Sequence, residues 1–173
     1  MAANGKPDPS TARNETTVER KSARELVVTR TFDAPAHIVF KAWTTPALLQ
    51  RWWAPKSYGI SFVACEADVR TGGTYRFVFS HPSSPEPMEF VGRYIEVTPN
   101  ARLVWTNEEA GPDGAVTTVT FEERGGKTQV VMQDLYPSEE ALDAAIASGS
   151  TGGFGETFEQ LDGVLAADAE TPR

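Results

Sequence analysis

The sequence has few of the residues that most often carry chemistry. Among 173 residues there is one cysteine, Cys65, and there are two histidines, His37 and His81. A single cysteine excludes an internal disulfide, and no spacing of these residues matches a zinc site. The sequence also lacks a G-x-S-x-G nucleophile elbow, a phosphate-binding G-x-x-x-x-G-K-[ST] motif and a dinucleotide fingerprint. We therefore expect no metal and no cofactor, and the lack of a catalytic constellation favours a protein that is not an enzyme.

Positive charge and long apolar runs are scarce as well. Lys and Arg number 16 against 24 Asp and Glu, which gives a formal net charge of −8 and opposes binding to nucleic-acid phosphates. No apolar run approaches the length of a membrane span, and the first residues lack the apolar stretch of a secretory signal. A lone cysteine fits a reducing compartment. These features predict a cytoplasmic protein that neither binds nucleic acid nor inserts into a membrane.

The chain divides into one domain with a tail at each end. Polar residues and prolines dominate residues 1–23, where Val18 is the only large aliphatic residue after Met1. Such a segment cannot bury enough apolar surface to offset its ordering entropy, so we predict a disordered tail. Residues 24–168 are the predicted single domain, a length that suits one hydrophobic core. Residues 169–173 are a predicted C-terminal tail.

The domain begins with a strand and two short helices. Glu25–Phe32 is rich in Val and Thr, which is typical of a strand. Pro35 and Pro46 each precede apolar residues at helical spacing, and proline's fixed φ suits a first helical turn.

From Ile60 onward, apolar residues recur with a period of two. Gly-, Pro- and Asn-rich breaks divide this part into six predicted strands: Ile60–Arg70, Thr74–His81, Met88–Val97, Arg102–Asn107, Val116–Glu123 and Thr128–Tyr136. The short links between them require antiparallel pairing. A helix at Glu139–Ala147 and a longer one after Phe154, with apolar residues in a single stripe, complete an α+β domain.

Four motifs carry a resemblance to a known superfamily. They are P-x-x-x-V-F-x-A-W at Pro35–Trp43, L-x-x-W-W at Leu49–Trp53, D-V-R-x-G-G-x-Y-R-F at Asp68–Phe77 and G-F-G-E-T-F-E-Q-L-D at Gly153–Asp162. In order and spacing they resemble the SRPBCC superfamily, also called START-like. Within it, the chain resembles most the homologues of the heat-shock-protein-90 ATPase activator.

This resemblance covers about Glu25–Ala167 and implies a helix-grip fold. In that fold a curved antiparallel sheet of about seven strands wraps a long C-terminal helix, and two short helices follow the first strand. A cavity usually remains between the sheet and the C-terminal helix.

Alternation along the predicted strands places one set of apolar side chains on a common inner face. A mostly apolar cavity suits a small hydrophobic or aromatic ligand, whereas the same residues would also fill a packed core. The resemblance favours a partial cavity. The predicted ligand-binding residues are Trp52, Trp53, Tyr58, Tyr75, Phe77, Phe79, Met88, Phe90, Trp105, Phe121, Met132, Phe154 and Phe158.

Two polar residues at predicted strand ends are the catalytic candidates. The ordinary pKa of His81 suits proton transfer near neutrality, although a histidine at a loop edge is more often simply solvated. Asp134 shares a predicted face with Met132, and a carboxyl group facing a cavity would have a raised pKa; an exposed strand end is an equal alternative. The resemblance to the superfamily also implies two functions other than ligand binding. One is a polyketide-cyclase-like or hydratase-like enzyme, and the other is a module that regulates a chaperone ATPase.

Overall fold

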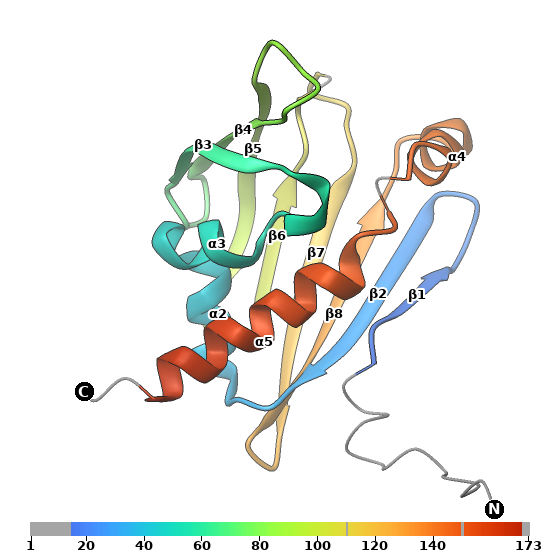
Figure 1. Cartoon of the computed structure of the whole chain (residues 1–173). Helices are drawn as coiled ribbons and strands as arrows, with labels where there is room; N and C mark the ends of the chain where they lie inside the picture. The colour runs from blue at the N-terminus through green and yellow to red at the C-terminus, as the bar shows by residue number, and fades with distance from the viewer. Residues whose placement is uncertain (1–14, 110, 150, 171–173) are drawn as a thin grey trace, which may run out of the picture.

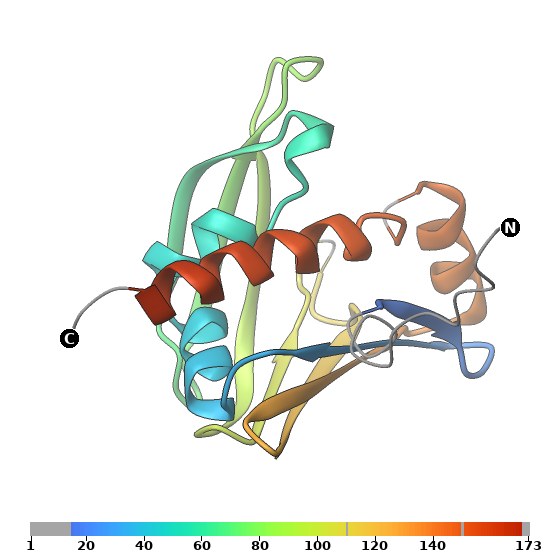
Figure 2. The same ribbon diagram turned by 60° about the horizontal axis from the view of Figure 1, so that its bottom comes forward.

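The computed structural model describes residues 15–109, 111–149 and 151–170. Within this part, eight strands form an antiparallel sheet in the order β1-β2-β8-β7-β6-β5-β4-β3. The sheet curves around α5 (Phe154–Glu170), and α2 (Ala36–Thr44) and α3 (Pro46–Trp52) lie on the same face as α5 (Figure 1; Figure 2). The predicted α+β helix-grip architecture is confirmed. None of the helices described is both long enough and apolar enough to cross a membrane.

The predicted elements appear in the predicted order, with bounds that differ by a few residues, and β1 and η1 are additional. The remaining elements are β1 (Thr17–Arg20), β2 (Glu25–Phe32), the 3-10 helix η1 (Lys56–Tyr58), β3 (Ser61–Ala67), β4 (Thr74–Ser80), β5 (Met88–Thr98), β6 (Arg102–Thr106), β7 (Val116–Arg124), β8 (Lys127–Leu135) and α4 (Glu139–Ala147). Each link within the β3–β8 meander is short, so each strand pairs antiparallel with the next.

Strand β1 corrects the prediction of a disordered tail over residues 1–23. Thr17–Arg20 pairs antiparallel with β2, and all four residues are exposed. Arg20 also forms an ion pair of 2.8 Å with Asp143 of α4. Backbone hydrogen bonds at a sheet edge therefore order this segment without apolar burial, which a composition argument does not detect. Residues 1–14 and 171–173 of the predicted tails lie outside the described residues.

Two bulges help to bend the sheet into a grip. The pairing of β3 with β4 shifts between Phe62 and Ala64, and the pairing of β5 with β6 shifts between Tyr94 and Glu96. The extra residues, Val63 and Ile95, are exposed in spite of being large and apolar. A bulge increases local twist, and these two shape the concave face that receives α5.

Gly92 of β5 is required by a close backbone contact. A Cβ atom there would lie 2.1 Å from the carbonyl oxygen of Thr106 and 2.6 Å from the ring of Tyr75. The Tyr75 hydroxyl donates to that same carbonyl at 2.7 Å, so neither group can retreat without breaking this buried hydrogen bond. We expect Gly92→Ala to lower the free energy of unfolding by about 2 kcal/mol.

Urea unfolding followed by tryptophan emission measures this effect. The matched control is Gly155→Ala on α5, where an added Cβ meets nothing within 4 Å and alanine favours the helix. A Gly92→Ala protein as stable as the wild type would show that β5 and β6 can separate freely at this point.

Candidate ligand-binding cavity

A cavity of about 390 Å³ lies between the concave face of the sheet, α5 and the segment from α3 to η1. Its wall is almost entirely apolar and aromatic because the inward positions of β4, β5, β6 and β8 meet the inner face of α5 there. The lining residues are Trp43, Trp52, Trp53, Ala54, Pro55, Tyr58, Ile60, Phe79, Met88, Phe90, Trp105, Asn107, Thr117, Met132, Asp134, Gly153, Phe154, Thr157 and Phe158.

All four tryptophans of the chain line this cavity. The rings of Trp43 and Trp52 meet edge to face with centroids 4.8 Å apart, and Trp53 lies 6.0 Å from Trp105. The Trp52 indole N–H donates to the carbonyl of Ala42 at 3.0 Å, which ties α3 to α2. These contacts hold large, rigid aromatic surfaces around the void.

Most of the predicted ligand-binding residues lie in this wall, and three do not. Phe77 packs behind Trp53, with ring centroids 5.5 Å apart. Phe121 packs against Phe40 of α2, and Tyr75 is held by its hydrogen bond to Thr106. These three support the wall from outside. Ligand contact by the residues that do line it stays a prediction.

The sequence-based set omitted several lining residues: Trp43, Ala54, Pro55, Ile60, Asn107, Thr117, Gly153 and Thr157. The alternation that turns Trp105 inward also turns Asn107 inward, and Thr117 shares a face with Phe121 in the same way. That signal was therefore sufficient to find both polar residues. Trp43 lies on the apolar face of a predicted helix, and only the packing of α2 onto the sheet brings it to the void.

A chain of hydrogen bonds joins the residue after β6 to β7 and β8 at the polar end of the cavity. The side-chain amide nitrogen of Asn107 donates to the carbonyl of Ala115 and to the hydroxyl of Thr117, both at 3.0 Å. The Thr117 hydroxyl in turn donates to Oδ1 of Asp134 at 2.6 Å. The register of β7 and β8 places Thr117 directly opposite Asp134, which is why this contact forms.

Asp134 is the only charged side chain among the described residues that line this cavity. It is half-buried, and burial raises its pKa from 3.8 to about 6, although the hydrogen bond from Thr117 opposes the rise. A carboxyl group in apolar surroundings loses much of its hydration, which disfavours the ionised form. The structure thus places this sequence candidate in the wall of the cavity, half-buried near the end of β8.

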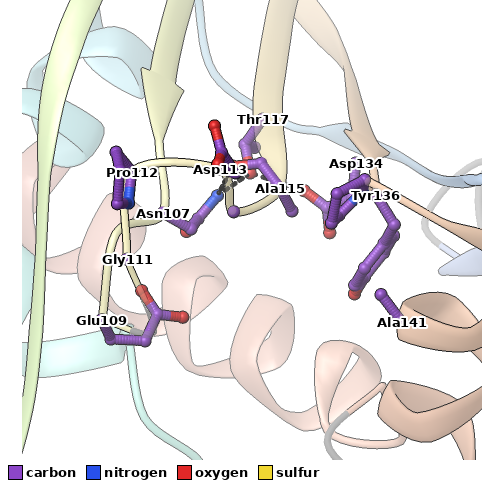
Figure 3. Close-up of a pocket in the computed structure, with 12 residues that line it drawn as sticks. Asn107, Glu109, Gly111, Pro112, Asp113, Ala115, Thr117, Asp134, Tyr136 and Ala141 are labelled. Carbon is purple, nitrogen blue, oxygen red and sulfur yellow. Dashed lines mark hydrogen bonds between the residues drawn. The ribbon is translucent and has the colours of Figure 1, made fainter.

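A second, more polar cavity of about 480 Å³ adjoins the first and shares Asn107, Thr117 and Asp134 with it. It lies between the loop that joins β6 to β7 and the start of α4. In Figure 3, Glu109 approaches the space from one side, and Asp134 and Tyr136 approach it from the other. Its other lining residues are Gly111, Pro112, Asp113, Gly114, Ala115, Pro137 and Ala141.

His81 does not join Asp134. Its Nδ1 accepts the backbone N–H of Ser83 at 3.0 Å and lies 2.6 Å from the Ser83 hydroxyl, in the loop between β4 and β5. It lines neither cavity.

Burial raises the pKa of the Cys65 thiol to about 11, which keeps it protonated and unreactive. Among the described residues, no group of three His, Cys, Asp or Glu side chains is placed to hold a metal ion.

A curved antiparallel sheet that grips a C-terminal helix around a cavity defines the helix-grip class of α+β proteins. The chain belongs to the family described as "Activator of Hsp90 ATPase homolog 1-like protein", whose profile matches residues 33–166. The fold of this family, a member of the SRPBCC superfamily, commonly binds hydrophobic ligands. The resemblance seen in the sequence motifs is confirmed.

Solved bacterial structures share this fold. A protein from Rhodobacter sphaeroides is 29% identical, with a TM-score of 0.80 over 88% of this chain and 99% of that chain. A protein from Staphylococcus epidermidis is 26% identical, with a TM-score of 0.72 over 91% and 98%. The AHSA1-like protein from Aeromonas hydrophila is 17% identical, with a TM-score of 0.65 over 85% and 96%, and supports the fold alone. A comparison with curated proteins finds no match.

Proposed function

We propose that the protein binds a small hydrophobic or aromatic molecule in the cavity between α5 and the sheet. The observation that carries this proposal is the void of about 390 Å³ walled by all four tryptophans. The cavity opens to solvent on one side, and its volume lies within the range of about 300–1,000 Å³ that is typical of small-molecule sites. An open cavity with a mostly aromatic wall is suited to binding a small apolar molecule.

The apolar wall sets the expected strength of binding. A ligand that buries roughly 200 Å² of apolar surface gains about 5 kcal/mol, before the entropy cost of association is subtracted. Small probes are therefore expected to bind with dissociation constants no tighter than about 0.2 mM. Tryptophan emission is a direct readout, because every indole lies in the wall.

We expect the uncharged probe 4-phenylbutanol to give a saturable change in tryptophan emission. Filling the cavity with Ala54→Phe should weaken this binding by at least about tenfold, since the new ring occupies space that the probe needs. Ala147→Phe is the matched control, because Ala147 is exposed on α4 and lines neither cavity. Calorimetric titration of the three proteins gives the affinities.

Two results would contradict the proposal. One is the absence of any saturable response to 4-phenylbutanol and its longer homologues. The other is equal affinity of the Ala54→Phe protein and the wild type, which would place the probe elsewhere on the surface.

The two alternatives implied by the superfamily have unequal support. An enzyme of the polyketide-cyclase or hydratase type would depend on Asp134 alone, because His81 lies outside the cavity. A carboxyl group with a pKa of about 6 inside an apolar cavity suits proton transfer to a bound substrate. Regulation of a chaperone ATPase rests on the family name alone, by analogy.

A further inference from the structure

We propose that the ligand of this cavity carries a protonated amine, which Asp134 binds where the apolar and polar cavities meet. This inference rests on the proposed function and adds the chemical class of the ligand. It follows from the direction of the hydrogen bonds around Asp134, from the charge of the surrounding side chains, and from the lack of a basic partner.

The hydrogen-bond chain fixes which groups remain for a ligand. A backbone carbonyl can only accept, so the contact with Ala115 requires the amide nitrogen of Asn107 to point that way. The other amide hydrogen goes to the Thr117 hydroxyl, whose own hydrogen goes to Oδ1 of Asp134. Among the side chains of Asn107, Thr117 and Asp134, every donor is therefore used. The Trp43 indole N–H, which is unpartnered among the described residues, and the Tyr136 hydroxyl line other parts of the two cavities. Asn107 Oδ1 and Asp134 Oδ2 have no hydrogen-bond partner among the described residues, and both are acceptors. A ligand must therefore bring donors to this point.

The charge of the polar cavity favours a cation over a neutral donor. Glu109, Asp113 and Asp134 contribute carboxylates to its lining, and no Lys, Arg or His side chain lines either cavity among the described residues. A ligand carboxylate or phosphate would be repelled there. The indole faces that line the apolar cavity beside Asp134 also attract cations. An amphiphile with an aromatic or aliphatic body and an ammonium head matches both cavities at once.

Asp134 has no Lys, Arg or His partner among the described residues, unlike the carboxylates of the structural ion pairs elsewhere in the protein. Buried carboxylates are normally paired with a cation. The described residues form ion pairs at several places, such as Arg30 with Asp162 and Arg93 with Glu108, but none of them pairs with Asp134. A purely structural link between β7 and β8 would be served by an amide at this position without the cost of desolvating a charge. The unpaired carboxylate is what an ammonium ligand would neutralise.

The test compares three probes that share one shape and differ in their head group. Calorimetric titration at neutral pH would use 4-phenylbutylamine, 4-phenylbutanol and 4-phenylbutyrate. We expect the amine to bind at least about tenfold more tightly than the alcohol, because a hydrogen bond to a charged group is worth more than a neutral one. The carboxylate probe should bind most weakly of the three.

Variants assign the preference to the residue. Asp134→Asn keeps the shape and removes the charge, so it should weaken amine binding by at least about tenfold and change alcohol binding by less than about twofold. Asp68→Asn makes the same chemical change at an exposed carboxylate paired with Arg70, outside both cavities, and should change neither. Glu109→Gln, at the rim, should weaken amine binding by about twofold to threefold.

The outcomes separate this inference from the proposed function. Equal binding of the amine and the alcohol to the wild type would overturn the amine preference and leave hydrophobic binding intact. An amine preference that persists in Asp134→Asn would place the head group elsewhere and overturn the role of Asp134. Failure of all three probes to bind would overturn both. The wild-type comparison stands even if a variant does not fold.

Discussion

Asp162→Ala is expected to lower the free energy of unfolding by about 3 kcal/mol. Asp162 of α5 accepts hydrogen bonds from both terminal nitrogens of Arg30 on β2, one of them at 3.1 Å. The Arg30 side chain is 4% exposed, and its guanidinium lies 4.8 Å from the ring centroid of Phe32. Its Nε already lacks a partner among the described residues. Removing the carboxylate would leave a buried, always-charged guanidinium without its counter-charge, which typically costs 3–5 kcal/mol.

The expected loss of about 3 kcal/mol lies at the low end of that range because the Asp162 side chain is 42% exposed, so water can partly replace the carboxylate. Urea unfolding followed by tryptophan emission gives the value. Glu159→Ala is the matched control on the same helix, where an exposed carboxylate should contribute less than about 0.5 kcal/mol. The double variant Arg30→Met with Asp162→Ala should recover much of the loss, because it removes the unpaired charge as well. Equal stability of Asp162→Ala and Glu159→Ala would refute this account.

The Arg30–Asp162 pair belongs to a set of contacts that position α5 over the cavity. Near the start of the helix, Glu156 accepts the backbone N–H of Ser57 at 2.8 Å. The side-chain amide of Gln160 donates to the carbonyls of Trp52 and Ala54 at 3.0 and 2.9 Å. These polar contacts fasten the helix to β2 on one side and to the α3–η1 segment on the other. These contacts therefore fix the position of α5 relative to the sheet, with the apolar cavity between α5 and the sheet.

The helix-grip fold was predictable because its elements obey local rules. Alternating apolar residues marked β4 to β8, and proline at the start of α2 and α3 marked those helices. The stripe of Phe158, Leu161 and Leu165 marked the buried face of α5. Strand β1 was not predictable, because its order comes from pairing with β2 and not from its own composition. The bulge residues Val63 and Ile95 also lie outside any period-two rule, since a bulge is defined by the partner strand.

The sequence predicted the types of side chain that form the site better than it predicted their arrangement. Side-chain alternation identified the aromatic face, but it could not separate residues that border a void from those that support them, such as Phe77 and Phe121. That distinction depends on how far α2 and α3 stand from the sheet. The hydrogen-bond chain from Asn107 to Asp134 depends on the register of three strands. A sequence shows the polar residues of each strand separately, and the fold decides which of them meet.

Asp134→Asn is expected to raise the free energy of unfolding at neutral pH by up to about 3 kcal/mol. Burial raises the pKa of Asp134 from 3.8 to about 6, so the folded protein holds this proton more tightly than the unfolded chain does. The contribution of this group to stability is therefore fully present below the unfolded pKa and is lost as the pH rises through the folded one. A difference of about two pKa units corresponds to about 3 kcal/mol, all of it lost above about pH 7. An asparagine of the same shape does not titrate and avoids this loss.

The pH dependence distinguishes this effect from a simple packing change. The stability difference between Asp134→Asn and the wild type should be small near pH 4, grow between about pH 4 and pH 7, and stay constant above that range. Urea unfolding of both proteins across this range gives the difference, in which the titration of all other groups cancels. Asp68→Asn, at an exposed carboxylate, should show no such growth. A difference that does not change with pH would mean that Asp134 has an ordinary pKa. The free energy lost on ionising Asp134 is the quantity that a bound ammonium group would recover, so 4-phenylbutylamine should raise the stability of the wild type more than that of Asp134→Asn.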